Sequence, residues 1–200
     1  MFSMYDMIAK KRDGGIMTDA EIRALIHSEW SEALEEERAG RPLVWHWCKD
    51  EGLRPTICEM QPNCTCKLDA WETDCPAYDQ KPEGGAVELI DGCIRILDYI
   101  AYKEWLDTGV SVESCRGIGR RECAQACGKL AENMTMAETV DLLHLFTALA
   151  RSEEIELYWL KAAMGLAFEW VAGRGLNPET IIQQKHRYNK TRPYKHGKRF

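Results

Sequence analysis

The chain has 200 residues and a formal net charge of −6, with 45% hydrophobic and 29% charged residues, as is ordinary for a soluble globular protein. This length predicts one domain over 1–200 that is large enough to bury a core. No apolar run approaches the ~20 residues that span a bilayer, and the first residues lack a secretory signal, so we expect a cytoplasmic protein without a membrane partner.

Helical periodicity and helix-boundary residues recur along most of the chain, and they predict an all-α fold, a bundle of about five helices. Thr18 and Glu21 form a capping box before the first helix, and Thr135 and Glu138 form a second one. Asn177 and Pro178 have the order of an N-cap followed by a proline in the first turn. Residues 114–129 are expected to be helical in part. The main predicted helices cover about 19–39, 82–106, 136–149, 153–171 and 178–188.

The segment of about 43–81 interrupts this pattern, because it has no helical period and is rich in proline and cysteine. We interpret it as an irregular insertion in a helical domain. Five of the nine cysteines lie in it within 28 residues, and they are the candidate ligands of a structural Zn²⁺: Cys48, Cys58, Cys64, Cys66 and Cys75. Their spacing is not that of two Cys-x2-Cys knuckles, so reduced thiols without a metal remain the alternative.

Two pairs of carboxylates have the spacing that brings side chains to one face of a helix. Glu29 and Glu32 are three residues apart in the first predicted helix, and Glu88 and Asp91 repeat this spacing in the second. If the helices are neighbours, the four carboxylates converge and attract Mg²⁺ or Mn²⁺, which prefer oxygen ligands. For the first pair alone, solvated surface charges are the favoured interpretation, since the same helix also carries Glu35, Glu36 and Glu37. The second lies in an otherwise apolar helix, where a charge needs a metal or a partner such as Arg95.

The last part of the chain is basic: residues 185–200 contain seven of the 26 Lys and Arg residues and no Asp or Glu. Lys185, Asn189 and Arg192 lie on one face of the last helix if it extends that far, and they are suited to hold a polyphosphate. A solvated basic tail is the alternative. Because the rest of the chain is acidic, we expect no nucleic-acid partner.

The two carboxylate motifs, "LIHSEWSEALEE" and "AVELIDGCIRILDYI", together with the closing "KHRYNKTRPYKHGKRF", resemble the all-α nucleoside triphosphate pyrophosphohydrolases. The most similar branch is the MazG-like one, including its phage-type members. The resemblance covers about 16–40 and 82–106 and then the terminal helix and tail. It implies hydrolysis of a (d)NTP to (d)NMP and pyrophosphate, which controls a nucleotide pool, in the host cytoplasm if the chain is phage-encoded.

The resemblance also implies a mechanism and a set of residues. Glu29, Glu32, Glu88 and Asp91 would hold Mg²⁺ or Mn²⁺, which activate a water for attack at the α-phosphorus, with Glu32 as the candidate general base. A homodimer or homotetramer is implied, since sites in this family often lie between protomers. The substrate-binding candidates are Lys185, Asn189 and Arg192, followed by Tyr188, Lys190, Tyr194 and His196.

The sequence departs from the family in the length of the Cys-rich insertion, which separates the two carboxylate motifs. Phage-type relatives differ in their substrates, some acting on purine deoxynucleotides and others on dUTP or on many nucleotides, so the preferred base stays open. The rival hypothesis is a zinc-stabilised interaction module whose basic tail binds nucleic acid. A second rival is an inactive family member that serves as a scaffold or nucleotide sensor.

Overall fold

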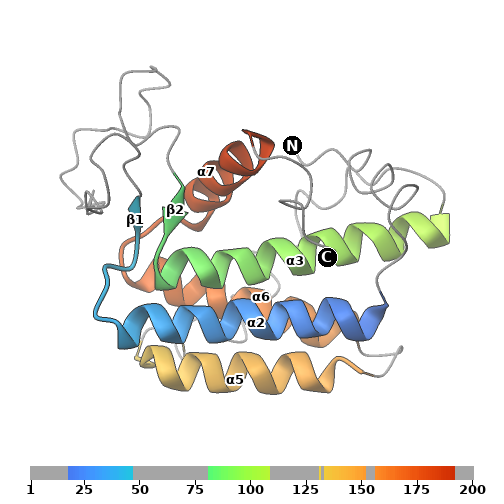
Figure 1. Cartoon of the computed structure of the whole chain (residues 1–200). Helices are drawn as coiled ribbons and strands as arrows, with labels where there is room; N and C mark the ends of the chain where they lie inside the picture. The colour runs from blue at the N-terminus through green and yellow to red at the C-terminus, as the bar shows by residue number, and fades with distance from the viewer. Residues whose placement is uncertain (1–17, 47–80, 109–130, 132, 152–155, 192–200) are drawn as a thin grey trace.

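The computed structural model describes residues 18–46, 81–108, 131, 133–151 and 156–191. Within these ranges the fold is all-α, as predicted, with five helices and one short two-stranded ladder (Figure 1). No helix in the described ranges is long and apolar enough to cross a membrane. The elements are α2 (Asp19–Arg38), β1 (Trp45–His46), β2 (Pro82–Glu83), α3 (Gly85–Thr108), α5 (Met136–Leu149), α6 (Glu156–Gly173) and α7 (Pro178–Thr191).

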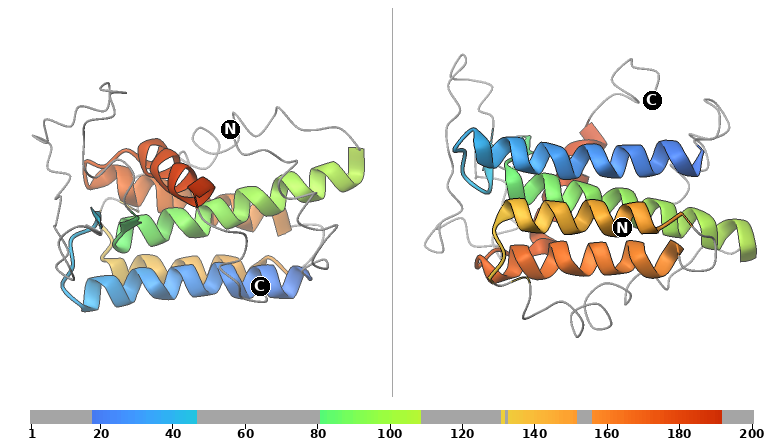
Figure 2. Two further views of the ribbon diagram at one scale, coloured as in Figure 1. Left: turned by 45° about the horizontal axis from the view of Figure 1, so that its top comes forward. Right: turned by 90° about the horizontal axis from the view of Figure 1, so that it is seen from below.

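Four long helices form a bundle in which each one packs against two neighbours. The contacts run from α2 to α3, from α3 to α6, from α6 to α5 and from α5 back to α2. Figure 2 shows the four helices running side by side, while the shorter α7 crosses over α3 at an angle. Helix α7 contacts α3, α6 and β2. Helix α3 therefore has neighbours on several sides, which explains why its sequence is apolar around most of its circumference.

The core of the bundle is built from the apolar positions that the helical periodicity predicts. Ile26 and Trp30 of α2 are fully buried, and so are Leu89 and Ile90 of α3. The indole of Trp30 also satisfies its polar atom, because Nε1 donates a hydrogen bond to Oγ1 of Thr147 on α5 at 3.0 Å. Helix α2 therefore packs against α3 and is hydrogen-bonded to α5 through Trp30.

Both predicted capping boxes are confirmed. The Thr18 Oγ1 accepts a hydrogen bond from the Glu21 N–H at 3.2 Å, and the Glu21 carboxylate accepts one from the Thr18 N–H at 2.7 Å. Thr135 and Glu138 repeat this exchange at the start of α5. At α7 the side chain of Asn177 caps the helix by accepting from the Glu179 N–H at 3.0 Å.

The predicted start of the second helix at Pro82–Glu83 is wrong. These residues form β2, which pairs with β1 in antiparallel register, Trp45 opposite Glu83 and His46 opposite Pro82. Helix α3 begins after Gly84, whose φ of +113° suits glycine. A Cβ at Gly84 would come within 2.6 Å of the Leu43 carbonyl oxygen. The backbone of Leu43, far away in the sequence, thus leaves room only for glycine at this turn. Local sequence patterns give no sign of this restriction.

A second glycine allows α2 and α3 to approach closely. A Cβ on Gly92 of α3 would come within 2.3 Å of the Trp30 ring. Gly92 directly follows Asp91, and Trp30 directly follows Glu29, so the closest part of the helix pair carries carboxylates from both helices.

Candidate metal centre

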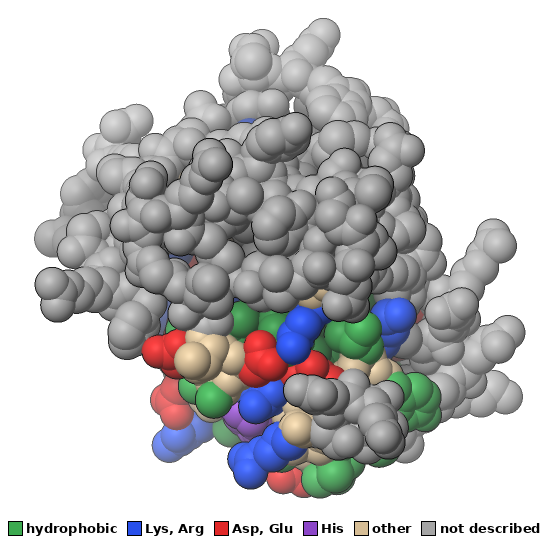
Figure 3. Space-filling view, turned by 90° about the vertical axis from the view of Figure 1, so that its right-hand side faces the viewer, with side chains coloured by type: hydrophobic (Ala, Val, Ile, Leu, Met, Phe, Trp, Pro, Cys, Tyr) green, Lys and Arg blue, Asp and Glu red, His purple; other side chains and the backbone are tan. Residues whose placement is uncertain are grey.

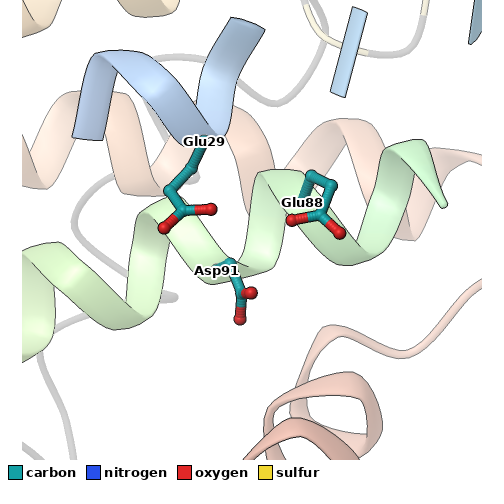
Figure 4. Close-up of side chains that lie close together, drawn as sticks. All are labelled: Glu29, Glu88 and Asp91. Carbon is teal, nitrogen blue, oxygen red and sulfur yellow. The ribbon is translucent and has the colours of Figure 1, made fainter. Parts of the chain in front are cut away.

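Three of the four predicted carboxylates converge on one point. Glu29 reaches from α2 across to α3, where Glu88 and Asp91 lie one turn apart (Figure 4). One carboxylate oxygen from each of the three lies within 4.8 Å of the others. Glu29 and Glu88 are buried and Asp91 is half-buried. We call these three residues the acidic cluster.

Glu32, the fourth predicted carboxylate, does not join the other three. It lies one turn after Glu29 on α2, is exposed, and its Oε1 accepts a hydrogen bond from the Ser28 hydroxyl at 3.1 Å. Its charge is close enough to contribute to the raised pKa of Glu29. Glu32 therefore lies at the solvent side of the acidic cluster.

Two cationic side chains reach the acidic cluster. Arg95 donates from Nε to Glu29 Oε1 at 3.0 Å, across the two helices. The hydrogen-bonded partner of Arg95 is therefore Glu29 of α2, and not Asp91 of its own helix as the spacing suggested. Lys185 of α7 places Nζ 2.7 Å from Asp91 Oδ2 and 3.8 Å from Glu88 Oε1. The Nζ of Lys185 also lies 3.4 Å from the Pro82 carbonyl oxygen.

The electrostatics of the cluster reflect burial and crowding of like charges. Burial raises the pKa of Glu88 to about 9, Lys185 opposes this rise, and Asp91 and Glu83 add to it. Burial also raises the pKa of Glu29, against the lowering effect of Arg95. Burial by itself lowers the pKa of Lys185, but Asp91 and Glu88 outweigh it and the net change is upward. Three carboxylates thus share two cations, and the raised pKa of Glu88 favours its protonated form.

The donor set fits a hard divalent cation. All three side chains offer carboxylate oxygens, which Mg²⁺ and Mn²⁺ prefer over nitrogen or sulfur ligands. Their spacing within 4.8 Å allows small side-chain shifts to bring them to one ion. A bound cation would also relieve the repulsion that keeps the Glu88 pKa high, because it replaces the proton as the neutralising charge.

The predicted phosphate-binding residues of α7 are described only in part. Lys185 is buried at the acidic cluster, and Asn189 follows it on the same helix face and is exposed. Tyr188 is half-buried, and of Lys190 only the backbone is described. The other candidates lie outside the described residues: Arg192, Tyr194 and His196 in the tail, and the proposed zinc ligands Cys48, Cys58, Cys64, Cys66 and Cys75.

Sequence reasoning missed another buried carboxylate, Glu156 at the start of α6. Its Oε1 accepts hydrogen bonds from Arg23 Nη1 at 3.0 Å and from the Tyr99 hydroxyl at 2.7 Å. Lys103 lies 3.8 Å from Glu156 and bonds Asp19 at 2.9 Å. We call these five residues the Glu156 network. Figure 3 views the molecule from this end of the bundle, where acidic and basic side chains lie beside one another in the described part.

Sequence reasoning also missed Glu83. It is buried in β2, contacts Lys81, and adds to the raised pKa of Glu88. No motif in the sequence marks Glu83, because its place beside Glu88 depends on the turn at Gly84.

Comparisons with known proteins give the chain no relatives. No family model matches it, and neither a curated protein nor a solved structure is significantly similar to it.

Proposed function

We propose that the chain is a metal-dependent nucleoside triphosphate pyrophosphohydrolase that converts a (d)NTP and water to a (d)NMP and pyrophosphate. The observation that carries the proposal is the convergence of Glu29, Glu88 and Asp91 from two helices, with Lys185 beside them. The motif spacing predicts this grouping from the sequence alone. The proposal includes a cytoplasmic location, a homodimer or homotetramer, and a role in controlling a nucleotide pool.

Within this proposal, each residue has the role that the resemblance implies. Glu29, Glu88 and Asp91 would hold Mg²⁺ or Mn²⁺, and an ion held there would supply positive charge for the triphosphate and lower the pKa of the water that attacks the α-phosphorus. Glu32, at the solvent side, is suited to accept the proton of the attacking water. As the bond from the α-phosphorus to the bridging oxygen breaks, the pyrophosphate leaves with the negative charge. Lys185 and Asn189 on α7 would bind that charge.

The test is a turnover assay with the full chain. Each of the eight common NTPs and dNTPs is incubated with Mg²⁺ or Mn²⁺, and monophosphate and pyrophosphate are measured separately. We expect both products in equal amounts, and we expect the double variant Glu88→Gln, Asp91→Asn to lose about a thousandfold or more in rate. The matched control, Glu35→Gln with Glu37→Gln, removes two exposed charges from α2 and should keep the wild-type rate.

Release of diphosphate and inorganic phosphate would assign the chemistry to another bond. No turnover of any nucleotide would contradict the enzyme proposal and leave two hypotheses: the inactive family member and the zinc-stabilised module with a nucleic-acid-binding tail. The module predicts binding that weakens steeply with salt. Its cysteines and most of its tail lie outside the described residues, and no observation on the described part favours it.

A further inference from the structure

Lys185 occupies the position in the acidic cluster that suits a bound cation. Its side chain is 4% exposed, so the ammonium group is held almost entirely by protein. Its three nearest polar partners are Asp91 Oδ2 at 2.7 Å, the Pro82 carbonyl oxygen at 3.4 Å and Glu88 Oε1 at 3.8 Å. Two of the three candidate metal ligands are therefore already in contact with a positive charge supplied by α7.

A divalent ion and this ammonium group compete for the same oxygens. Mg²⁺ and Mn²⁺ lie about 2.1 Å from a carboxylate ligand. An ion bound to Asp91 Oδ2 would thus lie within about 5 Å of the Lys185 Nζ. Two positive charges at this distance in a buried site repel each other strongly, since little water screens them. The metal therefore gains full use of Asp91 and Glu88 only when Lys185 withdraws.

The triphosphate of a substrate gives Lys185 a new partner. The lysine side chain is a flexible stem with a point charge, so its Nζ can leave Asp91 without movement of the α7 backbone. Phosphate oxygens are strong acceptors for an ammonium group. A substrate that brings both a metal and an anionic triphosphate replaces the carboxylate contacts of Lys185 with phosphate contacts in the same event.

We propose that Lys185 is an internal counter-ion that opposes binding of the metal alone and is displaced when metal and triphosphate bind together. This inference rests on the proposed function, and it adds a coupling between the two ligands of the site. The binding of each strengthens the binding of the other by the same factor, as thermodynamic linkage requires. Without a metal, Lys185 stays in contact with Asp91 and Glu88 and so links α7 to α3, which are neighbours in the fold.

The test measures Mn²⁺ binding to the full chain without nucleotide, from the electron paramagnetic resonance signal of free Mn²⁺ at mildly alkaline pH. Lys185→Met keeps the length of the apolar stem and removes the charge. We expect it to bind Mn²⁺ at least about tenfold more tightly than the wild type, within the usual range of coupling between sites. Lys185→Arg keeps the charge and should bind Mn²⁺ as weakly as the wild type.

The matched control is Lys103→Met, which removes an ammonium group that pairs with carboxylates away from the acidic cluster. It should leave Mn²⁺ affinity unchanged. Thermal unfolding with and without Mn²⁺ provides a second readout, because a ligand that binds the folded state raises the midpoint. Mn²⁺ alone should raise the midpoint of Lys185→Met and of Lys185→Gln more than that of the wild type.

The outcomes separate this inference from the proposed function. Equal Mn²⁺ affinity in the wild type and Lys185→Met would overturn the counter-ion role, even if the wild type hydrolyses nucleotides as proposed. Tighter binding by Lys185→Met would support the counter-ion role even if no nucleotide is turned over. Absence of Mn²⁺ binding by every variant would overturn this inference, and the turnover assay would then decide the proposed function by itself.

Discussion

The acidic cluster and the Glu156 network are both built around a buried carboxylate on a bundle helix, but they differ in their charge balance. In the Glu156 network, two carboxylates meet two cations and a tyrosine hydroxyl. In the acidic cluster, three carboxylates share Arg95 and Lys185. In the first set the carboxylates and cations are equal in number, whereas the second has three carboxylates to two cations and is balanced only while Glu88 holds a proton.

This difference teaches how to separate a structural network from a candidate site. Burial alone does not do so, since Glu88 and Glu156 are equally buried at 5% exposure. The raised pKa of Glu88 agrees with this charge count, because burial and the neighbouring carboxylates Asp91 and Glu83 both favour its protonated form. A buried carboxylate without a cation of its own keeps a proton, and a bound cation could replace that proton.

The largest expected effect on stability is at the balanced network. Glu156→Gln removes the negative charge that Arg23 and Lys103 share, and breaking a buried ion network by removing one partner costs about 3 kcal/mol. Urea unfolding, followed by tryptophan fluorescence, should show this loss. Glu88→Gln is the matched comparison and should change stability little, because glutamine resembles the protonated Glu88. A larger loss in Glu88→Gln than in Glu156→Gln would reverse the comparison.

The second-largest expected effect is the gain in protein stability when ligands bind. This gain should require the acidic cluster and not the Glu156 network. Mn²⁺ with an α,β-methylene nucleotide analogue should stabilise the wild type by about 2.7 kcal/mol at a concentration of a hundred times Kd. The double variant Glu88→Gln, Asp91→Asn should lose this gain, whereas Glu156→Gln should keep it despite its lower starting stability. Thermal unfolding with and without the ligands measures both. Loss of the gain in Glu156→Gln would show that the two networks are not independent.

A smaller effect is the pH dependence of stability in the metal-free protein. Because the pKa of Glu88 is raised to about 9, the folded chain holds a proton that the unfolded chain releases near pH ~4.3. The contribution of Glu88 is therefore fully present below pH ~4.3 and is lost as the pH rises toward 9, by at most about 1.4 kcal/mol per pH unit. Unfolding with urea and a chelator at several pH values should show this slope, and Glu88→Gln should lack it.

The smallest effect comes from a histidine pair outside both networks. His27 Nδ1 of α2 lies 2.7 Å from His144 Nδ1 of α5, and the rings stack. Burial lowers the pKa of both, and for His27 the neighbouring His144 lowers it further. Their contribution is present above pH ~6.5 and is lost as the pH falls. Solvent screens these partly exposed rings, so the effect should be below that of Glu88.

Variant His144→Gln tests this pair by thermal unfolding at pH values below and above the range in which histidine titrates. It should lose less stability on acidification than the wild type does. An unchanged loss would assign the acid sensitivity to other groups. Stability falls with rising pH because of Glu88 and with falling pH because of the histidine pair. The Glu88 effect is therefore measured most cleanly at alkaline pH, above the range in which histidine titrates.

Much of the fold was predictable because its signals are local. The capping boxes at Thr18 and Thr135 need only residues three positions apart, and both are confirmed. The start of α3 was not predictable, because the hydrogen bond from the Ala86 N–H to the Leu43 carbonyl oxygen joins residues far apart in the chain. Pro82 at an early helix position is a sound local prediction that a distant contact overrides.

The candidate site also has a part that the sequence predicts and a part that it does not. Helical spacing placed Glu88 and Asp91 on one face, and the order of the motifs placed Glu29 beside them. The partners were harder to predict, since Arg95 bonds a residue on another helix instead of Asp91 one turn away. The donors to Glu156 come from α2 and α3, and no motif marks them. Spacing predicts which residues share a face, whereas tertiary packing decides which charges pair.

The ladder between β1 and β2 also has a consequence for how the chain tolerates variation. It brings Trp45 and Glu83 opposite each other, so residues 47–80 leave and rejoin the bundle at neighbouring points. The entropy of closing a loop grows slowly with its length, by about 0.6 kcal/mol for each doubling. The ladder thus holds together the two points to which residues 47–80 are joined, so a change in the length of that segment need not move Glu29 and Glu88.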